Sequence, residues 1–332
     1  MILILAWAGI ISFAVIMYVL LDGFDLGIGI LFPWIKEQQS RDIMMSTVAP
    51  VWDGNETWLV LGTASLYASF PLAYSTLLPA LYMPLMVMLA ALIFRGVAFE
   101  FRFKSTPKSQ FIWDWSFAAG STIAAFGQGL VLGTFVKGYG SVLPTNISAL
   151  QWLSPFSVMT GIAVVVGYAL LGATWLIMRT VNDLQQKMFK AAKILLTGVV
   201  FFLLAVSVWS PLLSPHIFAR WFTLPDFYYL AILPSLTGVV ILYNFYFLRK
   251  QHEIWPFILS VSIFILAYIG FCISSWPYVI PHAVTLWDAA SPPSSLKFTL
   301  IGFCILLPVL LAYTVYSYRV FAGKVTSGEG HY

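Results

Sequence analysis

The chain has 332 residues, of which 60% are hydrophobic and only 9% are charged, and its mean hydropathy is +0.89. A soluble domain carries roughly 25% charged residues, so this composition excludes an ordinary soluble protein and indicates a polytopic membrane protein. The net charge of +4 does not indicate a nucleic-acid partner, because the basic residues form short clusters between apolar runs. Such clusters report membrane orientation instead.

Stretches without Lys or Arg predict about nine transmembrane helices, because a helix needs about 20 apolar residues to cross roughly 30 Å of hydrocarbon. The predicted fold class is an all-α polytopic membrane protein. We expect one integral membrane domain over residues 1–322 and a flexible cytoplasmic tail over 323–332. The predicted spans cover residues 2–32, 46–70, 76–96, 112–136, 156–178, 193–213, 227–248, 255–274 and 298–320.

The first predicted span has no charge in its first 21 residues and lacks the basic start of a signal peptide, so we expect it to be retained. It is longer than one crossing requires, and two elements are an alternative. The second span follows from a length argument. Residues 57–94 carry no charge but number only 38, whereas two crossings and a turn at Pro71 need somewhat more. The second helix therefore starts before Thr57 and draws in Asp53 and Glu56.

Orientation follows from counting Lys and Arg in alternate connections. One set of connections, with the C-terminus, holds 14 of the 17 basic residues, and the other holds only Lys137, Arg220 and Lys297. The positive-inside rule makes the first set cytoplasmic. We predict an N-terminus outside and a C-terminus in the cytoplasm.

Four acids lie in or beside these apolar runs, toward the predicted cytoplasmic side. Asp22 and Asp25 are three residues apart, as are Asp53 and Glu56, so each pair shares a helix face. A carboxylate in hydrocarbon is costly and must pair, hydrate or hold a proton, which makes such acids candidates for a proton or ion route.

Structural roles are the alternative for these acids. For Asp22 and Asp25, an ion pair with Arg95 or a position in the headgroup zone stays open. For Asp53 and Glu56, a proton or ion route is favoured, because the length of the second span draws both acids into the membrane. Arg95 and Glu100, at the inner end of the third span, are candidates for ion pairing.

The histidines argue against a haem in this chain. His216, His252, His282 and His331 all fall in predicted connections or the tail, whereas a haem in a helical bundle usually takes a histidine from a helix interior. The two cysteines show no metal-ligand spacing, so no metal site is expected.

Two motifs carry a resemblance to a known family. The run YVLLDGFDLGIG from Tyr18 is followed by APVWDGNETWL from Ala49, and later pieces agree at Phe94–Arg102, Trp113–Trp115 and Thr285–Ala289. In their order and spacing, along essentially the whole chain, they resemble subunit II of the cytochrome bd-type quinol oxidases. The VWDGNETW form and the short loops resemble the cyanide-insensitive branch.

The resemblance implies a subunit of an enzyme that oxidises quinol in the bacterial inner membrane and reduces oxygen to water. It implies nine spans in two four-helix bundles plus one peripheral helix, without haem. Haems b and d would belong to the partner, subunit I; a small accessory subunit and a structural quinone are further possible partners. By motif position, the acid on a cytoplasmic proton path would be Asp53, with Asp22, Asp25 and Glu56 nearby.

A proton-coupled secondary transporter is the alternative function, because acids in interrupted helices also suit transporters. Against it, the sequence shows no clear inverted repeat, and its acids lie toward one leaflet rather than at the midplane. A purely structural scaffold is a third interpretation.

Overall fold

The computed structural model describes residues 1–138, 150 and 152–325. Its first half is helical from the second residue onward. The elements are α1 (Ile2–Leu31), the 3-10 turn η1 (Phe32–Trp34), α2 (Gln38–Ser46), α3 (Trp52–Ser69), α4 (Pro71–Ala80), α5 (Tyr82–Arg102) and α6 (Gln110–Lys137).

The second half is also helical, apart from one short hairpin. The elements are α7 (Pro155–Arg179), α8 (Asn182–Leu213), α9 (Pro215–Phe222), α10 (Asp226–Leu230), α11 (Ile232–Arg249), α12 (Trp255–Ser275), β1 (Tyr278–Ile280), β2 (Val284–Thr285), α13 (Leu286–Ala289) and α14 (Pro293–Val320). Strands β1 and β2 pair antiparallel.

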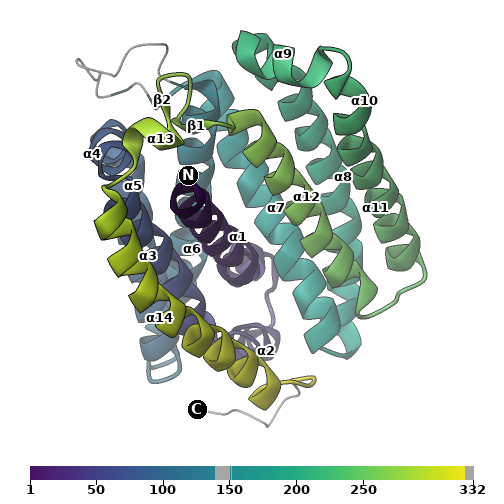
Figure 1. Ribbon diagram of the computed structural model, residues 1–332. Helices are drawn as coiled ribbons and strands as arrows, with labels where there is room; N and C mark the ends of the chain where they lie inside the picture. The colour runs from purple at the N-terminus through teal and green to yellow at the C-terminus, as the bar shows by residue number, and fades with distance from the viewer. Residues whose placement is uncertain (139–149, 151, 326–332) are drawn as a thin grey trace.

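The long helices form two groups, with α1, α3, α5 and α6 in one and α7, α8, α11 and α12 in the other (Figure 1). Helix α1 packs against both groups, and α14 lies along the outside, against α3 and α1. The hairpin and α9 lie at one end of the molecule, here called the hairpin end. Helix α2 and the end of α14 lie at the other, here called the α2 end.

Within the described part of the chain, eight helical segments are long and apolar enough to cross a membrane. Helix α3 is the remaining predicted span; it has 18 residues and lies between α1 and α14, but it is not among the eight. The prediction of an all-α polytopic membrane protein is confirmed. The first predicted span is one continuous helix.

The helices differ from the predicted spans at their ends, and the predicted span 76–96 is divided between α4 and α5 at Leu81. The second helix starts at Trp52 rather than residue 46, and the third continues to Arg102 rather than stopping at 96. Helix α5 passes Arg95 because acids from other helices pair with that charge. Between these helices the chain breaks at Pro71, since a proline lacks the N–H that would continue α3.

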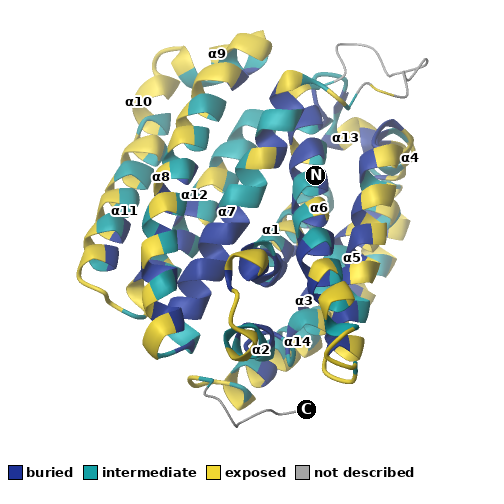
Figure 2. Cartoon of the chain, turned by 180° about the vertical axis from the view of Figure 1, so that it is seen from behind, coloured by how far each residue is buried: buried dark blue, intermediate teal, exposed yellow. Residues whose placement is uncertain are grey.

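Burial is greatest where α1 meets its neighbours, and the outer helices show exposed faces (Figure 2). Helices α1 and α7 approach so closely that a Cβ on Gly27 would overlap the backbone of Tyr168 and lie 2.8 Å from the Gly172 nitrogen. Small residues allow helices to approach in this way within a membrane. Gly27 therefore serves the close packing of α1 against α7.

The end of the chain crosses from α14 to the second group of helices. Lys324 Nζ lies 2.7 Å from Glu253 Oε1, and Arg179 donates to the Phe321 carbonyl. The hydrogen bond from Lys324 lowers the pKa of Glu253. Residues 326–332 of the predicted tail lie outside the described residues.

Candidate functional site

Two of the predicted acids pair with one guanidinium. Arg95 Nη1 lies 2.6 Å from Asp22 Oδ1, and Arg95 Nη2 lies 2.5 Å from Glu56 Oε1. The side chains of Arg95 and Asp22 are fully buried, and that of Glu56 is 28% exposed. Arg95 thus joins helices α1, α3 and α5, and its guanidinium also lies 6.0 Å from the Trp52 ring centroid.

Asp25 lies in the same buried region but has a different partner. Its Oδ2 accepts a 2.7 Å hydrogen bond from Asn55 Nδ2, whereas the ion pairs of Arg95 are with Asp22 and Glu56. Asn55 also donates to the Leu21 carbonyl at 3.3 Å and accepts from the Tyr318 hydroxyl at 3.0 Å. The sequence did not single out Asn55 or Tyr318, although Asn55 stands inside the WDGN motif.

We call Asp22, Asp25, Glu56 and Arg95 the acid cluster. It contains three carboxyl groups and one cation, in a region from which water is largely excluded. Within the described residues, Asp22 Oδ2, Asp25 Oδ1 and Arg95 Nε have no hydrogen-bond partner. Such groups are costly when charged and unpaired, and they are the usual components of proton relays inside membranes.

The remaining predicted residues lie outside the acid cluster. Asp53 is exposed in the first turn of α3, where an acid also interacts favourably with the helix dipole. Asp53 and Glu56 therefore have different surroundings despite their spacing of three. Glu100 is exposed as well, and its Oε2 lies 3.5 Å from Lys104 Nζ one turn along α5.

A second group of charges, which the sequence analysis missed, lies at the α2 end. Arg102 Nε and Nη1 bind Asp114 and Asp42 at 2.6 and 2.8 Å, and Arg41 Nη1 binds Asp114 at 2.8 Å. We call Arg41, Asp42, Arg102 and Asp114 the balanced cluster, because two cations meet two acids. It ties α2 to the end of α5 and the start of α6. Asp114 lies in the Trp113–Trp115 piece of the family resemblance, but no role was predicted for it.

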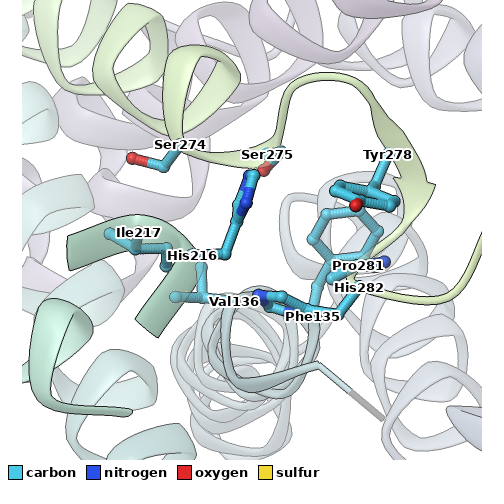
Figure 3. Close-up of a pocket in the computed structure, with 9 residues that line it drawn as sticks. All are labelled: Phe135, Val136, His216, Ile217, Ser274, Ser275, Tyr278, Pro281 and His282. Atoms are coloured by element: carbon cyan, nitrogen blue, oxygen red, sulfur yellow. The ribbon is translucent and has the colours of Figure 1, made fainter. Parts of the chain in front are cut away.

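The hairpin end carries a smaller polar site (Figure 3). His282 accepts from or donates to Ser214 Oγ at 2.6 Å, and the His216 ring lies 5.7 Å away, edge to face. His216 and His282 line a cavity of about 20 Å³, enough for one water molecule. Burial and the nearby His216 lower the pKa of His282. No group of three or more potential metal ligands occurs in the described ranges.

The helical membrane fold and its buried acid cluster define a class: integral membrane proteins with ionisable groups inside the bundle. The family model described as "Cytochrome bd terminal oxidase subunit II" matches residues 3–321. The chain therefore belongs to the family of subunit II of the cytochrome bd-type terminal quinol oxidases. As a subunit of such a complex it is part of an oxidoreductase.

Individual relatives agree along nearly the whole chain. The chain is 30% identical to "Cytochrome bd ubiquinol oxidase subunit 2" of Bacillus subtilis, with 97% of each chain covered. It is 27% identical to "Cytochrome bd-I ubiquinol oxidase subunit 2" of Escherichia coli K12, covering 97% of this chain and 95% of the relative. The bd oxidase structure from Geobacillus thermodenitrificans matches with a TM-score of 0.78 at 15% identity, covering 97% and 99%, which shows the shared fold.

These matches identify an oxidase subunit, so the transporter alternative is dropped. The eight candidate spans contain no histidine. In the described residues, His216, His252 and His282 lie in α9 or in connections.

Proposed function

We propose that this chain carries protons from the cytoplasm toward the oxygen-reducing centre of a haem-bearing subunit I. The supporting observation is the acid cluster, in which three carboxyl groups lie inside the bundle with one arginine that pairs with only two of them. Reduction of oxygen to water consumes protons, so an acid-lined path through the membrane is a physical requirement. A purely structural cluster needs no surplus of carboxyl groups.

The assembly proposed here has subunit I as the holder of haems b and d and of the quinol site. Two relatives are named ubiquinol oxidases, which supports a quinol as the electron donor for this complex. A small accessory subunit and a structural quinone are further proposed partners, without residues assigned to them. Membership of the cyanide-insensitive branch is proposed from the motif form, and a cyanide titration of oxygen uptake tests it.

The proposed location is the bacterial inner membrane, with the N-terminus outside and the C-terminus in the cytoplasm. The distribution of basic residues supports it, because 14 of 17 fall on the side assigned to the cytoplasm. The α2 end would then be the cytoplasmic end, and the acid cluster would lie in the inner half of the membrane.

Asp53 is proposed as the residue that connects the acid cluster to subunit I. It is exposed on α3, one turn from Glu56, whose carboxylate belongs to the cluster. Helix α3 is the least suited of the long helices to face lipid, since it carries Asp53, Glu56 and several hydroxyl groups. A protein partner on this face would shield those groups from hydrocarbon.

The experiment replaces Asp53 by Asn in the complete oxidase and measures quinol-driven oxygen uptake per haem. We expect turnover to fall about tenfold or more, equivalent to a barrier increase of ~1.4 kcal/mol, with normal haem content. Asp183→Asn, in an acid exposed in the first turn of α8, is the matched control. Unchanged turnover in Asp53→Asn would remove Asp53 from the path, and simultaneous loss of haem would make its role structural.

A further inference from the structure

The acid cluster divides into two parts with different charge balance. Arg95 uses its two terminal nitrogens for Asp22 and Glu56. Asp25 receives a hydrogen bond only from the neutral amide of Asn55, and its Oδ1 has no partner among the described residues. Its side chain is fully buried. An ionised carboxylate in such surroundings is costly, whereas a protonated one is not.

The amide of Asn55 faces Asp25 in one orientation. Its nitrogen lies against Asp25 Oδ2 and the Leu21 carbonyl, both acceptors, and its oxygen accepts the Tyr318 hydroxyl. A flipped amide would place Asn55 Oδ1 against the Leu21 carbonyl, which can only accept, so the amide keeps its nitrogen on this side. The Tyr318 hydroxyl on α14 donates to Asn55 Oδ1 and so holds the amide with its nitrogen toward Asp25.

The groups that face Asp25 come from several helices. Asp22 lies one turn away on α1, Glu56 and Asn55 come from α3, and Arg95 comes from α5. Tyr318 comes from α14 and itself faces Arg179 of α7. Around Phe24, α7 and α12 contribute the rings of Trp175 and Phe257.

From this arrangement we infer that Asp25 is the carboxyl group that holds and releases a proton, and that Tyr318 is a positioning residue acting through Asn55. Asp22 and Glu56 stay ionised as partners of Arg95. The step is proton transfer alone: the O–H bond at Asp25 breaks as one forms to an acceptor oxygen, and no electrons move. The donor amide of Asn55 then stabilises the carboxylate that remains. This inference rests on the proposed proton-carrying function.

The first test compares Tyr318→Phe with Tyr316→Phe in the assembled oxidase. Tyr316 stands on the same helix but is 69% exposed, so its variant is the matched control. We expect Tyr318→Phe to lower oxygen uptake per haem about three- to tenfold, as for the loss of one hydrogen bond, and to shift the pH profile of turnover. Wild-type rate and pH profile in Tyr318→Phe would overturn the positioning role.

The second test is infrared difference spectroscopy of the same complexes in H2O and D2O. We expect a carbonyl band of a protonated carboxylic acid, sensitive to D2O, in wild type and in Tyr316→Phe. The band should be absent from Asp25→Asn. A wild-type complex without this band, or an Asp25→Asn complex that keeps it, would overturn the assignment to Asp25.

Turnover separates failure of this inference from failure of the proposed function. If Asp25→Asn turns over normally while Asp53→Asn is slow, the assignment to Asp25 is wrong and the proton path stands. If Asp22→Asn, Asp25→Asn and Asp53→Asn all turn over as wild type, the proposed function itself is wrong. Haem content and the thermal midpoint, measured for each variant, identify those that fail to assemble.

Discussion

The two charge clusters use arginine in opposite ways. In the balanced cluster two arginines meet two acids, and the charges on α2, α5 and α6 cancel. In the acid cluster one arginine pairs with two carboxylates, and Asp25 accepts a hydrogen bond from the Asn55 amide instead. The first arrangement is sufficient to hold helices together. The second has one more acid than pairing explains, which is why it is the candidate for proton transfer.

Location supports the same distinction. The balanced cluster contains the fully buried Arg102, but its Asp42 is 44% exposed, so that cluster reaches the surface at the α2 end. Asp22, Asp25 and Arg95 are fully buried. Surface ion pairs contribute little to stability, whereas breaking a buried pair leaves an uncompensated charge and costs far more. The consequences of removing each arginine should therefore differ.

The largest effect is expected for Arg95→Met. It leaves Asp22 and Glu56 without a cation inside the bundle, and breaking a buried pair in this way costs about 3–5 kcal/mol. We expect a sharp drop in the yield of assembled complex and in its thermal midpoint. Arg249→Met, at the exposed end of α11, is the control. Normal yield and midpoint in Arg95→Met would show that the acid cluster does not depend on this cation.

A smaller effect is expected for Arg102→Met. Asp114 keeps Arg41 as a partner, and Asp42 is exposed enough to be solvated. We expect a loss of about 1.5–3 kcal/mol, the range for hydrogen bonds to charged groups, measured as a lower thermal midpoint. Oxygen uptake per haem should stay normal in the complex that assembles. Reduced uptake per haem would contradict the distinction between the two clusters.

The smallest effect concerns the hairpin end, where neither cluster reaches. In the folded protein the pKa of His282 is lowered below its ordinary value of 6.5. Below that pH, His282 therefore binds a proton more readily in the unfolded chain than in the folded one. The stability that His282 contributes is therefore complete above 6.5 and is lost as pH falls further. The thermal midpoint of wild type minus that of His282→Asn should shrink between about pH 7.5 and about pH 5.5. A constant difference would contradict this.

Part of the site could be predicted from the sequence, because acids in apolar runs are visible without a structure. Asp22, Asp25 and Glu56 were singled out in this way, and Arg95 was named for ion pairing. The sequence could not show that Asp53 and Glu56 have different surroundings. Their spacing indicates a shared helix face, but not which residues of other helices contact it. The structure places one in the acid cluster and the other on the exposed surface.

The balanced cluster was not predictable by the same reasoning. Arg102, Asp114 and Arg41 stand near predicted span ends, where charged residues are ordinary. Only the packing of α2 beneath α5 and α6 brings them within 2.8 Å. The same applies to Tyr318, which is 263 residues from Asn55 and is one of many aromatic residues near helix ends.

The sequence by itself determined the class of protein and most of its membrane-spanning helices, because hydrophobic length and charge distribution are local properties of the chain. It also determined the family, through motifs that are continuous in sequence. Only the tertiary structure decided which carboxyl group receives the guanidinium of Arg95, 73 residues from Asp22. Pairing between helices depends on their packing, and packing in a membrane is set by contacts between residues distant in the chain.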